Sequence, residues 1–283
     1  MAKLKKQHMT IHWKAIVQDD SSIPATEATL KEKATLVGRI GLMMLSVGTG
    51  AWRVRNSMNK VARCLGITCT ADIGLLAISY TCIEGTDTYT QSISNPTTGV
   101  NTHKLMQLEL FMKEFPDKVS TYSVKHIHEV LDEIQKLPAN YKAWNLGLAS
   151  ALACGAFTFL LGGGPVEMCC AFLGAGVGNF VRKKMLGHSI SLLANVAVSV
   201  AASCLVYVLT ILLAQSLLSV SAVHQAGYIC AMLFVIPGFP LITGGIDLAK
   251  LDLRSGLERV SYALLIILTA TMTGWATAVI CHF

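Results

Sequence analysis

The segment from residue 190 to residue 215, ISLLANVAVSVAASCLVYVLTILLAQ, decides the fold class because it contains no charged residue. A helix that crosses the hydrocarbon core of a bilayer needs about 20 predominantly apolar residues. The segment belongs to a longer stretch between Lys184 and Asp247 in which no Asp, Glu, Lys or Arg occurs. These residues therefore predict membrane-spanning helices.

The composition of the whole chain agrees with this prediction. Of the 283 residues, 53% are hydrophobic and 14% are charged, against about 25% charged residues in an ordinary soluble domain. The charged residues are concentrated before residue 143. This asymmetry indicates a polar N-terminal domain followed by a membrane domain, and it argues against both a disordered chain and a wholly soluble enzyme.

Three gaps between charged residues predict five membrane spans. The gap from Lys142 to Arg182 contains one acid, Glu167, and has room for two spans, as does the gap from Lys184 to Asp247. The uncharged stretch after Arg259 supplies one more. Glycine, proline and polar clusters divide the gaps, which gives approximate spans at 144–161, 165–181, 190–215, 223–244 and 260–281.

Basic residues in the predicted loops set the orientation. They occur only in the second and fourth connections, as Arg182, Lys183, Lys184, Lys250, Arg254 and Arg259. The positive-inside rule places these loops in the cytoplasm together with the N-terminal domain. Five spans then leave Phe283 outside. We predict a multi-pass protein of the inner (plasma) membrane with a cytoplasmic N-terminus and an extracytoplasmic C-terminus.

The polar half predicts a flexible cytoplasmic tail over residues 1–30 and a cytoplasmic α+β domain over residues 31–140, ahead of the membrane domain at 141–283. Apolar residues that recur every three or four positions predict one long helix over residues 31–65. Alternating residues and the turn at Glu84–Asp87 predict strands that follow it. Two further helices are predicted on either side of Pro116, at 101–115 and 123–137.

Neither a catalytic site nor a metal or cofactor site is expected. The chain contains no phosphate-binding loop, nucleophile elbow or HExxH motif. His126 and His128 are two positions apart on a predicted helix, so they point to different faces. The net charge of +6 comes from basic residues that are mixed with acids, and no recognition motif accompanies them, so nucleic acid is not an expected partner.

Several short motifs resemble the threonine/serine exporter (ThrE) family over roughly residues 34–280. The most specific is Ile236-Pro237-Gly238-Phe239-Pro240-Leu241-Ile242, which is followed by Asp247 and by Ser255-Gly256-Leu257-x-Arg259. Supporting motifs are Gly50-Ala51 with Arg53-Val54, Gly99-Val100-Asn101-x-His103, and Gly162-Gly163. Because the chain has only the first set of spans, it looks like the larger subunit of the family's split, YjjP-type version.

The resemblance implies a transporter rather than an enzyme. Such subunits work with a short membrane protein of the YjjB type and export small polar metabolites, which are threonine and serine for fused members and succinate for split ones. We also expect a higher-order oligomer in the lipid bilayer. Because no ATP site is visible, the expected mechanism is secondary transport. The alternatives are a membrane-anchored sensor or scaffold and a membrane-anchored hydrolase, each with a cytoplasmic domain that binds a small ligand.

The residues expected to form the substrate path surround the proline break in the fourth predicted span. Proline lacks an N–H, and backbone groups freed in a bilayer are tolerated only where protein or water satisfies them. Transporters use such broken helices to bind polar substrates. The predicted path residues are Pro237, Gly238, Pro240, Thr243, Gly244, Asp247, Asn179, Arg182 and Arg259. The alternative is a kinked, packed helix in which Asp247 pairs with Lys250 or Arg254.

Two further residues are candidates outside this break. Glu167 is the lone acid of its predicted span, so it is expected to act either as a gate or proton acceptor or as the first-turn acid of a helix that begins at Pro165. His103 is a candidate in the cytoplasmic domain, because it matches a family motif.

Overall fold

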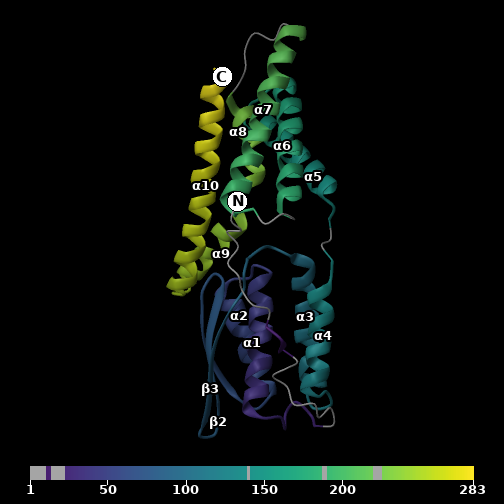
Figure 1. Cartoon of the computed structure of the whole chain (residues 1–283), viewed down its shortest axis with the longest axis vertical. Helices are drawn as coiled ribbons and strands as arrows, with labels where there is room; N and C mark the ends of the chain where they lie inside the picture. Colours follow the sequence, from purple (N-terminus) through teal and green to yellow (C-terminus); the bar gives the residue numbers. More distant parts are fainter. Residues whose placement is uncertain (1–10, 14–22, 139–140, 187–189, 219–224) are drawn as a thin grey trace. The chain divides into compact units, whose positions relative to one another are not determined.

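The computed structural model of the chain describes residues 11–13, 23–138, 141–186, 190–218 and 225–283, which are mostly helical and include one small sheet (Figure 1). They fall into two compact units. The α/β unit contains the described residues up to 138 together with Phe239–Val260. The helical unit contains the described residues of 141–238 together with Ser261–Phe283. The predicted tail over residues 1–30 lies largely outside the described residues.

The α/β unit begins with two helices where the sequence predicted one. Helix α1 (Leu30–Ser46) starts with a capping box, in which Thr29 and Glu32 each bind the other's backbone N–H. It ends before Gly48, whose φ is +95°, a conformation that favours glycine. Helix α2 (Ala51–Cys64) starts after Gly50. The prediction of a single helix over 31–65 was therefore wrong, since a glycine in the left-handed region interrupts it.

The three strands form an antiparallel sheet in the order β1 (Thr68–Ile73), β2 (Ala77–Glu84) and β3 (Asp87–Ser94). Glu84 pairs with Asp87, so a two-residue turn with Gly85 at positive φ joins β2 to β3. Alternate residues of β2, such as Ile78 and Tyr80, are buried. These strands confirm the small sheet that the sequence predicted.

Helix α3 (Thr102–Lys118) continues through Pro116, which the sequence analysis treated as a separator before α4 (Val124–Lys136). A proline inside a helix leaves the carbonyl four residues earlier without its N–H partner. That carbonyl belongs to Met112, and Lys60 on α2 donates its Nζ to it at 2.7 Å. The extra donor explains why the helix does not end before Pro116.

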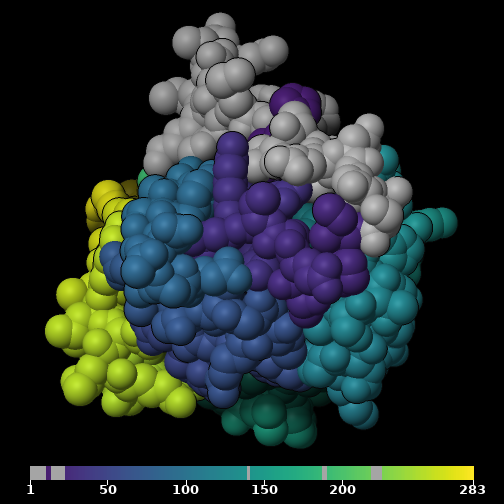
Figure 2. Space-filling model, turned by 90° about the horizontal axis from the view of Figure 1, so that it is seen from below, coloured from purple at the N-terminus to yellow at the C-terminus, as the bar shows by residue number. Residues whose placement is uncertain are grey.

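The core of the α/β unit lies around α1, which is placed between the sheet and α4 (Figure 1). Figure 2 shows one end of this unit. The purple residues of α1 and of the segment before it lie between the blue residues of the sheet and the teal residues of α3 and α4. Leu36, Ile40 and Met44 are fully buried in this core. Arg39 is buried beside them, and it donates to His128 Nδ1 at 2.8 Å and pairs with Asp132 on α4.

Three helices among the described residues are long and apolar enough to cross a bilayer: α5 (Ala143–Leu160), α7 (Leu192–Leu218) and α10 (Leu253–Ile280). The number is four if α8 (Gln225–Ala231) and its 3-10 extension η2 (Leu233–Val235) form one bent span with α9 (Gly238–Ala249). Helix α6 (Pro165–Leu186) has the length of a span but contains charged residues near both ends. The protein is thus a multi-pass helical membrane protein, whereas the count of five spans stays a prediction.

Small residues bring α5 and α6 together, as expected for helices that pack in lipid. A Cβ atom added to Gly147 on α5 would lie 3.0 Å from the carbonyl oxygen of Gly176 on α6. A Cβ added to Gly176 would lie 3.2 Å from Cβ of Ala151. Side chains larger than these would push the two helices apart.

The helix break near Pro237 is shorter than the sequence suggested. Residues Ile236 and Pro237 separate η2 from α9, and Pro240 lies in the first turn of α9, where a missing N–H costs no helical hydrogen bond. Gly244 and Gly245 lie inside the same regular helix. These two glycines therefore do not interrupt α9. Gly244 instead permits close packing, since an added Cβ would lie 3.1 Å from Cβ of Arg259 on α10.

Candidate functional site

A buried ion pair lies between α9 and α10 in the α/β unit. Arg259 Nε lies 3.3 Å from Asp247 Oδ2, and the two side chains are 2% and 0% exposed. Ser255 donates its hydroxyl to Asp247 Oδ2 at 2.9 Å and accepts from Arg259 Nε at 3.1 Å. A buried ion pair needs additional hydrogen bonds to offset the loss of water, and Ser255 supplies one to each partner.

Asp247 also caps helix α2. Its two carboxylate oxygens accept from the backbone N–H of Ala51 at 3.0 and 3.1 Å. The residue at the N-cap position is Gly50, which has no side chain to bind the free N–H groups of the first turn. The carboxylate also lies at the positive end of the helix dipole, which favours an anion. A residue 196 positions away in the sequence thus performs the role of a local cap.

Arg259 binds the connection between α1 and α2. Its Nη2 donates to the carbonyl oxygen of Thr49 at 2.7 Å, and its Nη1 lies 3.5 Å from that of Gly48. The Thr49 hydroxyl donates back to the carbonyl of Met44 at 2.7 Å, in the last turn of α1. We call Thr49, Gly50, Ala51, Asp247, Ser255 and Arg259 the Asp247–Arg259 site.

A loop from a third part of the chain packs against the same connection. The N–H of Asn101 donates to the carbonyl of Val47 at 3.2 Å. A Cβ added to Gly48 would lie 2.8 Å from the carbonyl oxygen of Gly99. The motif segments near residues 50, 100, 247 and 255 are therefore neighbours. His103 lies two residues beyond this contact, and its buried Nδ1 has no hydrogen-bond partner among the described residues.

Charged residues around the site hold the α9–α10 turn against α2 and the sheet. Arg55 on α2 binds Asp252 with two hydrogen bonds of 2.6 and 3.1 Å, which raise the pKa of Arg55. Arg254 pairs with Asp72. Glu258 accepts from the N–H of Leu75 at 2.6 Å. These contacts could not be predicted from the sequence, because their partners are more than 180 residues apart and share no pattern.

The alternative pairings expected for Asp247 are not the ones found. Arg254 binds Asp72 and Glu258 instead, and the ammonium group of Lys250 lies 4.2 Å from the ring centroid of Trp52. Thr243 lies one turn before Asp247 on α9, and its hydroxyl donates to the carbonyl of Phe239 at 2.8 Å. That bond uses the only donor of the Thr243 hydroxyl, whose oxygen can still accept a hydrogen bond.

Four of the predicted path residues belong to the helical unit: Asn179, Arg182, Pro237 and Gly238. Asn179 donates to the carbonyl of Leu146 at 3.1 Å, so it joins α6 to α5. Arg182 donates to the carbonyl of Phe234 at 3.1 Å, beside the break that contains Pro237 and Gly238. A carbonyl freed near the break is therefore satisfied by a neighbouring side chain. Glu167 accepts from the N–H of Gly164 at the start of α6, the geometry of a first-turn acid.

The family model described as "Putative threonine/serine exporter" matches residues 35–281. The chain belongs to this exporter family. Two similar curated proteins bear the name "Probable succinate transporter subunit YjjP". The one from Klebsiella aerogenes is 25% identical over 236 residues, covering 82% of this chain and 87% of the relative. The one from Escherichia coli K12 is 24% identical over 235 residues, covering 83% and 88%. No solved structure matches the chain.

Membership confirms the resemblance that the motifs carried, and it makes the chain a membrane transporter protein rather than an enzyme. Within the family match, the quoted motifs supply every residue of the Asp247–Arg259 site except Thr49. Sequence reasoning had named Asp247 and Arg259 individually. It missed the contact between them, and it also missed the roles of Ser255 and Thr49.

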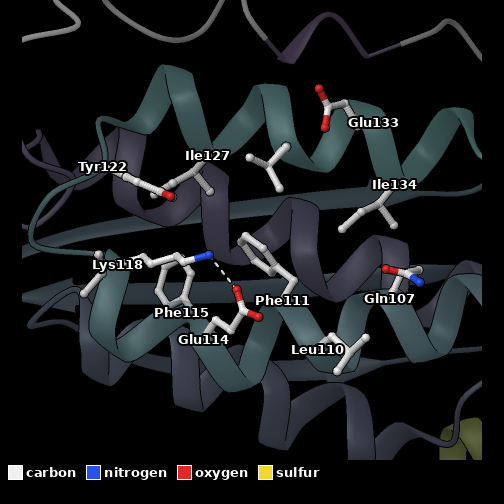
Figure 3. Close-up of a pocket in the computed structure, with 12 residues that line it drawn as sticks. Gln107, Leu110, Phe111, Glu114, Phe115, Lys118, Tyr122, Ile127, Glu133 and Ile134 are labelled. Carbon is white, nitrogen blue, oxygen red and sulfur yellow. Dashed lines mark hydrogen bonds and ion pairs between the residues drawn. The ribbon is translucent and has the colours of Figure 1, made fainter.

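Two hollows of the α/β unit are separate from these predicted residues. The larger, about 320 Å³, lies between α3 and α4, where Phe111 and Phe115 face Ile127 and Ile134, with the Glu114–Lys118 ion pair at its edge (Figure 3). The smaller, about 110 Å³, is bordered by Arg39 and Lys104. None of the predicted site residues lines either hollow.

Proposed function

We propose that the chain is the larger subunit of a secondary exporter for small polar metabolites in the inner (plasma) membrane. Its partner in this proposal is a short membrane subunit of the YjjB type, within a higher-order oligomer. Family membership and the two relatives named as succinate transporter subunits support the proposal. The substrate classes are amino acids such as threonine and serine, or dicarboxylates such as succinate.

The observation that carries the mechanism is the buried pair of Asp247 and Arg259. A guanidinium group binds carboxylates through well-oriented hydrogen bonds, and a carboxylate is common to both proposed substrate classes. In the proposed cycle the substrate carboxylate takes the place of Asp247 on Arg259. Asp247 can then keep the N–H of Ala51 and the hydroxyl of Ser255 as partners, which limits the cost of the exchange.

The remaining residues have proposed roles along the same path. The proposed path includes Pro237 at the break and four residues of α9: Gly238, Pro240, Thr243 and Gly244. Arg182 and Asn179 are proposed contacts on α6, and Glu167 is the proposed gate or proton acceptor. His103 is a proposed contact in the α/β unit, because its buried Nδ1 has no partner among the described residues.

Flux into proteoliposomes tests the proposal directly. We expect threonine, serine or succinate to move only when the chain is reconstituted together with its short partner. Thr243→Val and the double variant Asp247→Asn with Arg259→Gln are expected to reduce flux at least tenfold. The double variant avoids leaving one unpaired buried charge, which alone destabilises strongly. Arg254→Gln is the control, since its ion pair with Asp72 is exposed.

Two outcomes would contradict this proposal. Absence of flux from correctly assembled parental protein would remove the transporter function and favour a sensor or scaffold. Parental flux that survives all the Thr243, Asp247 and Arg259 variants would place the path elsewhere. Assembly with the partner is checked for every variant by size-exclusion chromatography, so that loss of flux is not confused with loss of the complex.

A further inference from the structure

Helix α7 of the helical unit has a buried polar face that is not part of the predicted path. Its residues recur at every fourth position, so they lie on one side of the helix, and each is at most 2% exposed: Asn195, Ser199, Ser203 and Tyr207. At a rise of 1.5 Å per residue, this face extends over about 18 Å. We call these four residues the polar seam.

Two atoms of the polar seam have no hydrogen-bond partner among the described residues. Ser199 donates to the carbonyl of Val196, and Ser203 donates to that of Ala231 at 2.7 Å. Asn195 Nδ2 donates to the carbonyl of Arg182 at 3.2 Å. The two atoms without a partner are Asn195 Oδ1 and Tyr207 Oη, and both are buried. Leaving such groups unpaired destabilises a protein, and polar residues within a membrane domain are functional candidates by default.

Glycines on the neighbouring helices bring backbone close to the polar seam. A Cβ added to Gly178 on α6 would lie 2.7 Å from Cβ of Ser203, and one added to Gly227 on α8 would lie 2.4 Å from Tyr207 Oη. The seam therefore lies between α6, α7 and α8, which run side by side (Figure 1). Two of the residues proposed above flank it on α6, since Arg182 lies beside Asn195 and Glu167 is within electrostatic range of Tyr207.

We propose that the polar seam is a solute-binding part of the transport path and that it selects solutes carrying a hydrogen-bond donor. This inference rests on the proposed exporter function. Asn195 Oδ1 can only accept, and the bond from its Nδ2 to the carbonyl of Arg182 fixes which side of the amide faces the seam. Its partner must therefore donate. A hydroxyl group, an ammonium group or a protonated carboxyl group meets this need, whereas a fully ionised dicarboxylate without a hydroxyl group does not.

Tyr207 complements Asn195 because its hydroxyl can donate as well as accept. Asn195 and Tyr207 are about 18 Å apart along α7, too far for one small solute to bind both at once, so a solute hydroxyl group pairs with each in turn as the solute moves along the seam. A site built to bind a hydroxyl group rejects the analogue without it, because its own polar groups then stay unpaired. The seam thus favours hydroxylated or amino-bearing acids over acids of the same length that carry no hydrogen-bond donor.

The test compares pairs of solutes that differ by one hydroxyl group, using the full chain reconstituted with its short partner. The pairs are threonine with 2-aminobutyrate and malate with succinate. We expect the parental protein to prefer the hydroxylated member. Tyr207→Phe and Asn195→Leu should each reduce that preference about tenfold, the value of one hydrogen bond of about 1.4 kcal/mol. Tyr207→Phe removes an atom without a partner among the described residues, so its melting temperature should not fall.

Tyr228→Phe is the matched control. The Tyr228 ring lies 5.7 Å from that of Tyr207, but its hydroxyl donates to the carbonyl of Gly274 at 2.7 Å. This variant should lower the melting temperature and leave the solute preference unchanged.

Unchanged preference in Tyr207→Phe, with flux retained, overturns the seam proposal while the exporter function stands. If Asn195→Leu does not assemble, Tyr207→Phe decides alone. Absence of flux for all four solutes in the parental protein overturns the exporter function and the seam proposal together.

Discussion

Gly50 shows how a single missing side chain shapes the Asp247–Arg259 site. An added Cβ would lie 2.9 Å from Asp247 Oδ1, closer than side-chain carbons approach a carboxylate. Gly50→Ala should therefore displace the cap from α2 and destabilise the protein by about 1–3 kcal/mol, the range for overpacked sites. Gly245→Ala is the control, since an added Cβ there meets nothing within 4 Å. It should be neutral or stabilising by up to about 1 kcal/mol. Equal melting temperatures for the two variants in detergent would contradict this prediction.

A substitution at Glu167 can distinguish a role at the helix end from a role in proton transfer. Its bond to the N–H of Gly164 can be made by a glutamine oxygen as well as by a carboxylate. Glu167→Gln should therefore assemble normally, and if Glu167 is the proton acceptor it should flatten the dependence of flux on pH. Glu258→Gln is the control, because Glu258 also accepts from a backbone N–H but lies in the α/β unit. A pH profile that matches the parental one would leave Glu167 with the helix-end role alone.

The turn between α9 and α10 is held to α2 by charge, and this predicts measurable coupling between elements. Arg55 and Asp252 share two hydrogen bonds and are partly shielded from water. A double-mutant cycle with Arg55→Gln and Asp252→Asn should give a coupling energy of about 0.5–1 kcal/mol that falls at high salt. The exposed Glu114–Lys118 pair within α3 should show little coupling. Additive effects of the Arg55 and Asp252 substitutions on thermal unfolding would refute the contribution of this contact.

Local sequence patterns predicted the helices and strands whose ends are determined by neighbouring residues. Apolar periodicity and the Glu84–Asp87 turn located the first helical region and the β2–β3 hairpin. The end of α1 was missed because the apolar spacing of Val47 and Ala51 continues through it, while Gly48 ends the helix and Asp247 caps the next one. The prediction that a helix ends before Pro116 was wrong because Lys60, on another helix, donates the hydrogen bond that the proline cannot. Contacts made by residues so far apart in sequence leave no periodic signal.

The whole molecule divides in a way that charge distribution alone did not suggest. The segment Phe239–Val260 contains the end of a predicted span and a predicted loop, yet it groups with the α/β unit. Its apolar composition resembles that of the membrane helices, so hydropathy assigned part of it to lipid. Ion pairs with α2 and the sheet, rather than hydropathy, explain its place in that unit. The motifs that identify the family are concentrated in this segment and in the residues it contacts.

Whether the number of membrane spans is odd or even decides the side of the membrane on which Phe283 lies. With a cytoplasmic N-terminal domain, three or five spans place Phe283 outside the cell, whereas four spans place it inside. The basic loops at 182–184 and 250–259 favour five spans. We therefore expect alkaline phosphatase fused after Phe283 to be active and green fluorescent protein fused there to be dark. The same reporters fused after Lys184, in a chain truncated at that point, should give the reverse result and serve as the control. Fluorescence without phosphatase activity at Phe283 would contradict this prediction and would require an even number of spans. The assignment of α8, η2 and α9 would then be the first to change, because these elements count as one span only if they form a bent pair.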